Sequence, residues 1–351
     1  MLDGWHNPPD ECCGKWTADG KYFVFQSQGQ IWALPRTIGL FQSSPPPIPL
    51  TSSPLTLSSP LPSKDGKKLF VVGRNFRGQL MRYDSKSEHF VPFLGGMSAE
   101  YMAFSKDGQW IAYVSFRDGT MWRSRLDGSD RLQLTFPPMY PVLPRWSPDG
   151  KQILFFEFAV GAKPARIYTV SAEGGSPRQI LFDDQSQQLD PNWSPDGSKI
   201  VFAGESNDPA SAIHIFDLAT HQLSSLPAST SFFSPRWSPD GRYIAAFSAN
   251  SDSMFLYDFQ TQKWASLFSG SLSWLNWSHD GHYLYALDNR GKNAVVRIRV
   301  SDHKVEQVAD LTDFSFTGRY GGALVLTPDD QPLLLQDTGT QDIYSVDWQS
   351  Q

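Results

Sequence analysis

The sequence predicts an all-β fold, a β-propeller of eight four-stranded blades, with seven blades as the alternative. Three observations lead to this prediction. A turn motif of the form Trp-Ser-Pro-Asp-Gly recurs along the chain, its copies are evenly spaced, and the 351 residues are rich in aromatic residues, Gly and Pro. Aromatic strands separated by Gly/Pro turns are typical of all-β proteins.

The turn motif is complete in three places, which are Trp146 to Gly150, Trp193 to Gly197 and Trp237 to Gly241. Five further copies depart from it: Trp16 to Gly20, Phe104 to Gly108, Trp277 to Gly281, Ser63 to Gly66 without an aromatic residue, and a decayed copy, Thr327 to Asp330. Successive copies lie 40 to 49 residues apart, the length of four short strands with their turns. Seven blades result if the decayed copy forms no blade of its own.

The residues of the motif suit a tight hairpin turn. Pro presets the first central position, Asp bonds to nearby backbone, and Gly adopts a positive φ without steric cost. We therefore expect a structural role at the turns for Asp19, Gly20, Asp65, Gly66, Asp107, Gly108, Asp149, Gly150, Asp196, Gly197, Asp240, Gly241, Asp280 and Gly281. The Trp before the turn suits the seam between blades, because it is large and apolar.

Each turn is followed by an apolar strand, such as Ile153 to Phe156, then by a third strand, such as Ile167 to Val170, and a weaker fourth. Near-continuous apolar runs fit strands that are covered on both faces, as in stacked blades. One domain over 1–351 is predicted, with blades near 10–52, 53–95, 96–136, 137–183, 184–226, 227–268, 269–312 and 313–351. The N-terminal residues 1–6 are expected at the seam, paired with Ile343 to Val346, whose blade otherwise lacks a fourth strand.

The motif, its apolar strand and the following Ile-Tyr-x-Val at Ile167 to Val170 resemble the TolB-like propeller repeat over nearly the whole chain. The stretch from Trp5 to Gly20 is most similar to the propeller region of bacterial CadC-like winged-helix regulators. This resemblance implies a sensor or interaction part of a larger regulator. The alternative is the substrate-gating propeller of a peptidase whose catalytic domain is absent from this chain.

Charge and hydropathy narrow the function classes. A net charge of −6 argues against a nucleic-acid partner, and no apolar run is long enough to span a membrane. The first residues lack the features of a secretory signal, so the chain as it stands reads as cytoplasmic, or as periplasmic within a membrane-anchored parent. Cys12 and Cys13 are adjacent, and we expect free thiols rather than a redox or metal pair.

No cofactor and no metal site are expected. His279 and His282 flank one turn, and Asp183-Asp184 and Asp329-Asp330 are paired carboxylates, but none has the ligand spacing of a metal site. No nucleophile with an adjacent base is visible, and no Gly-x-Ser-x-Gly motif occurs, so the chain is predicted to be non-enzymatic.

A protein or peptide is the predicted partner. Arg145, Asn192, Arg236 and Asn276 each precede a repeat Trp, on the strand next to the central channel, where they could bind an anion or a peptide terminus. The alternative is that they bond to neighbouring blades. Aromatic residues in the connections entering these strands, Tyr140, Phe232, Phe233 and Trp274, are expected on the same face as possible binding hot spots.

Overall fold

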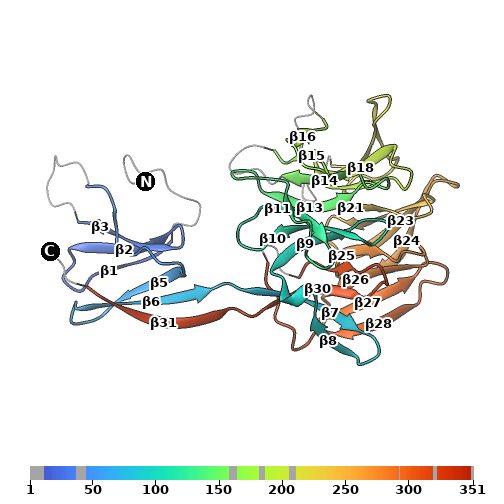
Figure 1. Ribbon diagram of the computed structural model, residues 1–351. Coiled ribbons are helices and arrows are strands. Elements are labelled where there is room, and N and C mark those ends of the chain that lie inside the picture. Colours follow the sequence, from blue (N-terminus) through green and yellow to red (C-terminus); the bar gives the residue numbers. More distant parts are fainter. Residues whose placement is uncertain are drawn as a thin grey trace. The chain divides into compact units, whose positions relative to one another are not determined.

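The computed structural model describes residues 12–36, 45–157, 164–181, 186–204, 211–291, 293–318 and 322–348, and in these ranges the regular elements are strands apart from one 3-10 turn, η1 (Leu94–Gly96). The chain divides into two units (Figure 1). The smaller unit takes the residues up to Arg77 and those from Asp337 onward, and the larger unit runs from Gly78 to Gln336. No helix of the described ranges is long and apolar enough to cross a membrane.

The larger unit contains six antiparallel sheets of four strands each. Five are built from consecutive strands: β9–β12 (Ala99–Phe104, Trp110–Ser115, Met121–Arg125, Leu132–Gln133), β13–β16 (Pro141–Trp146, Gln152–Glu157, Arg166–Ser171, Arg178–Gln179), β17–β20 (Leu189–Trp193, Lys199–Ala203, Ile213–Asp217, Leu223–Ser225), β21–β24 (Phe232–Trp237, Tyr243–Ser248, Ser253–Asp258, Lys263–Ser269) and β25–β28 (Leu272–Trp277, Tyr283–Asp288, Ala294–Arg299, Val305–Asp310). The sixth has the order β29-β30-β7-β8 (Val325–Leu326, Pro332–Asp337, Gly78–Asp84, His89–Pro92).

These six sheets form a closed ring. The first strands β9, β13, β17, β21, β25 and β29 contact one another in this order, and β29 contacts β9 again. The sixth sheet joins β7 and β8, from the beginning of the unit, to β29 and β30, from its end. Such a closure leaves no sheet edge at the seam of the ring, which is how propellers avoid an unpaired strand.

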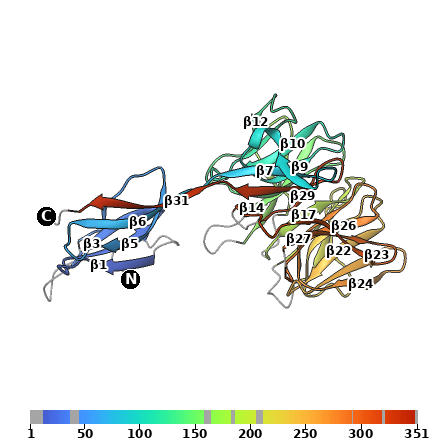
Figure 2. The same ribbon diagram turned by 90° about the horizontal axis from the view of Figure 1, so that it is seen from below.

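The smaller unit contains two sheets. One has the order β1-β2-β3-β4 (Cys12–Trp16, Tyr22–Ser27, Gln30–Pro35, Ile48–Pro49), and the other has the order β31-β6-β5 (Thr340–Asp347, Lys68–Asn75, Thr56–Pro62). Val24, Ile31, Leu57, Leu69 and Val71 form the buried core of the unit. The red strand β31 lies beside β6 over its whole length (Figure 2), from Thr340 opposite Asn75 to Asp347 opposite Lys68.

The eight motif copies give eight sheets, which confirms the all-β prediction and the predicted number of sheets. Two differences concern their grouping. The predicted single domain is two units, and the strands of the predicted blades 53–95 and 313–351 are exchanged: β7 and β8 complete the sheet of the last turn, whereas β31 joins β6. The physical reason is that β7 and β31 are both third strands with the same alternating pattern, so either can pair with either second strand. The β31-β6-β5 sheet has three strands among the described residues.

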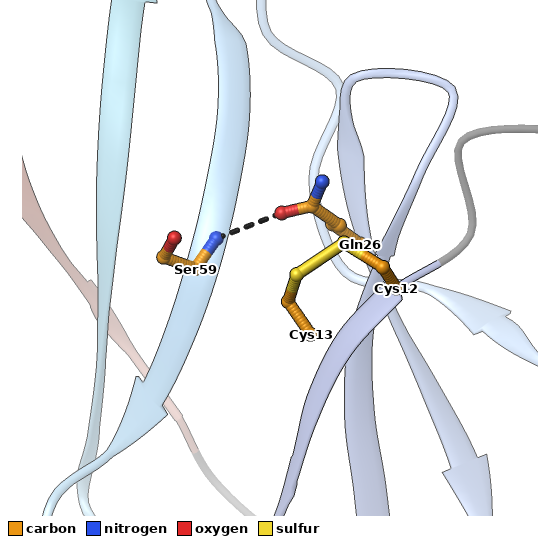
Figure 3. Close-up of a disulfide and its surroundings, with 4 residues drawn as sticks. All are labelled: Cys12, Cys13, Gln26 and Ser59. Carbon is orange, nitrogen blue, oxygen red and sulfur yellow. Dashed lines mark hydrogen bonds between the residues drawn. A yellow bond between two sulfur atoms is a disulfide. The ribbon is translucent and has the colours of Figure 1, made fainter.

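Cys12 and Cys13 form a disulfide, where free thiols were expected (Figure 3). Neighbouring residues of a regular strand point to opposite faces. Here β1 carries an irregularity between Cys12 and Lys15, and Cys13 has a φ of 62°, so the strand is turned locally and both sulfur atoms meet. Beside this disulfide, the backbone N–H of Ser59 donates to Oε1 of Gln26 at 3.0 Å. The predicted pairing of residues 1–6 lies outside the described residues.

Candidate functional site

All eight turns are held by the same side-chain bonds. In the fourth copy the Ser147 hydroxyl donates to Oδ1 of Asp149 at 2.6 Å, the same oxygen accepts from the Lys151 N–H at 3.1 Å, and Gly150 has a φ of 71°. The equivalent hydroxyl–carboxylate bond joins Thr17 to Asp19, Ser63 to Asp65, Ser105 to Asp107, Ser194 to Asp196, Ser238 to Asp240, Ser278 to Asp280 and Thr327 to Asp329. These bonds stabilise the charged carboxylate, and at Asp196 they lower the pKa to about 2.

Five of the six first strands of the ring carry a β-bulge three residues before their aromatic residue. The bulge residues have φ between 52° and 58° and coincide with a register shift against the second strand; they are Tyr101, Leu143, Asp190, Ser234 and Trp274. Asp190 is the acidic member of this set, and its carboxylate accepts a hydrogen bond from Ser234 of the neighbouring sheet. Sequence reasoning missed both residues, although counting three positions back from each Trp would have found them.

The repeat Trp residues join neighbouring sheets, as the sequence predicts. Their indole N–H groups donate to backbone carbonyls of the preceding first strand: Trp146 to Ala103 at 3.2 Å, Trp193 to Arg145 at 3.1 Å and Trp277 to Arg236 at 3.0 Å. Trp237 differs, because its indole bonds within its own turn to Gly241 while its backbone N–H donates to Oδ1 of Asn192 at 2.9 Å. Neighbouring sheets are therefore joined by hydrogen bonds as well as by apolar packing.

Three of the four predicted polar residues bond to a neighbouring sheet. Asn192 accepts from Trp237, and Nδ2 of Asn276 donates to the carbonyl of Leu324 at 2.9 Å. Arg236 is buried at 5 % exposure and forms an ion pair with Asp190, with 2.7 Å between Nη1 and Oδ1. These three residues thus bond to neighbouring sheets, which was the alternative to ligand binding at these positions.

Arg145 is the exception. It is half-buried, and no ion pair within 4.0 Å joins it to a carboxylate of the described residues. Burial and the neighbouring Arg236 guanidinium lower its pKa to about 9, against the opposing effect of Asp190. Arg145 is therefore still a cation at neutral pH. Asp190 is the carboxylate near both Arg145 and Arg236, and it forms its ion pair with Arg236.

Arg145 lines a pocket of about 390 Å³ at the turn end of the channel, to which all six sheets of the ring contribute. The polar lining includes Asn192 and Asn276, and the apolar lining includes Trp193, Trp277 and the turn prolines. Its ionisable residues are Lys106, Arg145 and His279, and no Asp or Glu of the described chain lines it. A pocket with this lining favours an anionic group, because three basic residues face it without a carboxylate.

The other predicted site residues lie elsewhere. Tyr140 precedes β13, at the opposite end of that strand from Arg145, and its hydroxyl donates to Oε1 of Glu100 at 2.7 Å. Trp274 lies 6.2 Å from Tyr101, ring centre to ring centre, and lines a separate cavity of about 350 Å³. Phe232 stacks on Phe255 at 4.8 Å. The expected cluster of basic and aromatic groups on one face is therefore divided between the two ends of the first strands.

The histidine pair is also divided. Nδ1 of His279 lies 2.7 Å from Oδ1 of Asp330, whereas Nδ1 of His282 lies 3.1 Å from Oδ2 of Asp280 in its own turn. Over the described ranges, no group of three or more His, Cys, Asp or Glu residues is placed to hold a metal ion. The pair Asp183-Asp184 falls outside those ranges.

No protein-family model matches this sequence, and no curated protein matches it. Solved structures do match. An oligogalacturonate lyase from Vibrio parahaemolyticus has a TM-score of 0.51 and 13 % sequence identity, over 94 % of this chain and 92 % of the lyase.

That lyase corrects the prediction that this chain is not an enzyme. The prediction assumed that proteins of this kind carry their chemistry on a separate catalytic domain. A lyase whose own length is matched over 92 % leaves little chain for such a domain, so a fold of this kind does not exclude catalysis.

Two further structures bear on the fold itself. A TolB protein from Agrobacterium tumefaciens matches with a TM-score of 0.60 and 18 % identity, over 75 % of this chain and 99 % of its own. TolB from Acinetobacter baumannii matches with a TM-score of 0.52 and 16 % identity, over 82 % of each chain. Together with the six-sheet ring and its repeated turns, these likenesses show that the chain has a TolB-like β-propeller fold.

Proposed function

We propose that the larger unit binds a protein or peptide ligand in the turn-end pocket and holds a carboxylate of that ligand at Arg145. The observation that carries the proposal is the state of Arg145, a half-buried cation in the channel pocket with no ion-pair partner among the described residues. Partial burial of a charge without a partner costs free energy, and a ligand carboxylate would supply the partner that the protein does not.

The guanidinium group favours a carboxylate in particular. Arg presents its N–H donors as a planar fork that matches the two oxygens of a carboxylate. The backbone carbonyl of Arg145 is already fixed by the Trp193 indole, so the strand that carries the side chain is held in place. Such preorganisation lowers the entropic cost of binding.

The walls of the pocket favour a peptide over a bare inorganic anion. The pocket that contains Arg145 is also lined by the apolar side chains of Trp193, Trp277, Pro148 and Pro195. Aromatic residues and Arg are the residue types that contribute most to protein interfaces. Asn192 and Asn276 are already bonded to neighbouring sheets, so Arg145 is the pocket's principal group for recognising charge.

The proposal is tested with a fluorescein-labelled pool of random pentapeptides that carry a free C-terminal carboxylate, compared with the same pool as C-terminal amides. Fluorescence anisotropy should show binding of the carboxylate pool to the wild-type protein and at least about tenfold weaker binding of the amides, as expected for loss of a charged contact. Arg145→Gln should lose the same factor. The exposed Lys151→Gln is the matched control, since it removes a cation next to a turn but outside the pocket.

Two results would overturn the proposal. One is binding of both pools with equal affinity, and the other is an Arg145→Gln protein that is folded by circular dichroism and binds like the wild type. The absence of any binding to the wild type would equally reject a peptide ligand.

The wider biological role is a hypothesis that rests on the sequence resemblance alone. It places the propeller in the interaction or sensor part of a bacterial regulator. The coding sequence that neighbours this chain tests it: an upstream winged-helix domain supports the regulator, and a downstream hydrolase domain supports the peptidase alternative.

A further inference from the structure

The residue that follows the Ser or Thr of each turn in the larger unit occupies an equivalent position around the ring, and five of these six residues line the pocket. We call these six positions the collar; they are Lys106, Pro148, Pro195, Pro239, His279 and Pro328. Each collar proline lies against the Gly of the next turn around the ring. A Cβ placed on that Gly would lie 3.4 Å from Pro148 at Gly197, 3.8 Å from Pro195 at Gly241, 3.6 Å from Pro239 at Gly281 and 3.3 Å from Pro328 at Gly108.

Two collar positions carry a basic side chain in place of proline, and both line the pocket that contains Arg145. At Lys106 the Pro–Gly contact is missing, and a Cβ on the next turn glycine, Gly150, would meet nothing within 4 Å. At His279 both partners of the contact are changed, because the next turn has Asp330 where the other turns have Gly.

The His279–Asp330 pair replaces an apolar contact with a charged one. Oδ1 of Asp330 lies 2.7 Å from Nδ1 of His279 and accepts from the His279 backbone N–H at 3.0 Å. Asp330 adopts a φ of 57°, a conformation that Gly would hold without steric cost. Four other pairs of neighbouring turns in the ring keep the Pro–Gly contact. Folding alone therefore does not explain why His279 and Asp330 replace Pro and Gly here.

The bond to Asp330 leaves Nε2 as the second ring nitrogen of His279. In the neutral ring with Nδ1–H donating to Asp330, Nε2 is an acceptor and repels an anion; in the protonated ring Nε2–H is a donor and binds one. The charged groups around this imidazole are Asp330, Asp280 and Asp329, and His282 follows in the same turn. The bond to Asp330 raises the pKa of His279, so the donor form extends toward neutral pH.

We infer that the ligand of this pocket carries a second anionic group, held by Lys106 and His279, and is therefore a peptide that ends in Asp or Glu. This inference rests on the proposed function. It assigns the C-terminal carboxylate to Arg145 inside the channel and the acidic side chain to the two basic collar residues at its rim. The opposite assignment, with the acidic side chain at Arg145 and the C-terminal carboxylate at Lys106 and His279, describes the same class of ligand.

The test uses two labelled pentapeptide pools with free C-terminal carboxylates, one ending in Asp or Glu and the other in Asn or Gln. The wild type should prefer the acidic pool by about tenfold at pH 6, as an added charge contact gives, and by less at pH 8, where a smaller share of His279 is protonated. The Asp and Glu side chains and the C-terminal carboxylate stay ionised across this range, so the anionic groups under test do not titrate.

The decisive variant is the double change His279→Pro with Asp330→Gly, which restores the contact that the other collar prolines make and should fold well. Its preference for the acidic pool should be the same at pH 6 and pH 8. Lys106→Pro should reduce the preference at both pH values and keep its pH dependence.

A preference that still weakens from pH 6 to pH 8 in the double variant would overturn the role of His279 and reduce the pair to a structural contact between turns. Equal binding of the two pools by the wild type would overturn the second anionic group and leave the proposed function intact. Binding of neither pool would instead reject the proposed function itself.

Discussion

The larger and smaller units use the same turn, but the ring buries or half-buries the aromatic residue before it, whereas the smaller unit leaves Trp16 exposed. Trp146 and Trp193 are 9 % and 8 % exposed, whereas Trp16, at the equivalent position, is 53 % exposed. In the ring the preceding first strand accepts the indole N–H of both Trp146 and Trp193. Trp16 packs on Phe23 of its own sheet, with 5.4 Å between ring centres. The motif therefore encodes a hairpin, and burial of its Trp depends on neighbouring sheets.

The two units also differ in how their strands are paired. Every second strand of the ring is paired on both sides, and the seam is closed by β7 and β30. In the smaller unit β31 is an edge strand over the described residues, with Ile343 at 77 % and Tyr344 at 40 % exposure. An exposed edge with apolar side chains is a weak point of a sheet. We therefore expect the ring to be the more stable unit.

The largest expected effect is on the buried Trp. Trp193→Ala removes a side chain packed between two sheets and leaves the Arg145 carbonyl without its donor, so we expect a loss of about 3–5 kcal/mol in the unfolding free energy. Trp16→Ala should cost less than about 1 kcal/mol, because half of that side chain is already in water. Urea unfolding followed by circular dichroism measures both.

Trp193→Phe is the matched control, since it keeps most of the buried ring and removes the N–H donor. It should cost about 1–2 kcal/mol, the range for one buried hydrogen bond and a small cavity. Similar losses in Trp193→Ala and Trp16→Ala would contradict the difference between the two units.

The next effect concerns hydrogen exchange at the edge strand. The amides of β31 that do not face β6 should exchange at least about a hundredfold faster than those of β14, which is paired with β13 and β15. Exchange measured by NMR resolves the two strands. Equal protection of Ile343 to Val346 and Ile153 to Phe156 would mean that another strand covers the edge. The prediction that residues 1–6 pair there would then gain support.

Much of this fold is local and periodic, and those parts were predictable from the sequence. The Ser-Pro-Asp-Gly motif and its variants mark the hairpin between the first two strands of each sheet, and the Trp before it marks the contact with a neighbouring sheet, because both depend on residues close together in the chain. The exchange of β7 and β31 was not predictable. Both strands have the same alternating pattern, and neither sequence specifies which distant second strand it pairs with. The disulfide was missed for a related reason: adjacent cysteines meet only where a bulge turns the strand, and Cys13 occupies the bulge position.

The candidate site was predicted in part. Of the four polar positions predicted to face the channel, Arg145, Asn192 and Asn276 line one pocket, whereas Arg236 does not line it. Asp190 was missed because its ion pair with Arg236 of the neighbouring sheet depends on contacts between strands that are far apart in the sequence. The collar was missed because Lys106 and His279 read as decayed copies of a turn, and the structure is needed to show that Asp330 faces His279.

The smallest expected effect separates backbone strain from contact between sheets. Gly197 and Gly66 have nearly the same φ, 74° and 71°, but a Cβ on Gly197 would lie 3.4 Å from Pro148 of the neighbouring turn, whereas a Cβ on Gly66 would meet nothing within 4 Å. A β-branched residue is strained at such a φ wherever it occurs. Gly197→Val should therefore lower the unfolding free energy by about 1–3 kcal/mol, and Gly66→Val should lie at the low end of that range. Alanine at each position adds the Cβ alone and should cost about 1 kcal/mol at both. Thermal melts of the four variants measure this. An equal loss for the two valine variants would show that the collar contact between neighbouring turns adds nothing to the stability of the ring.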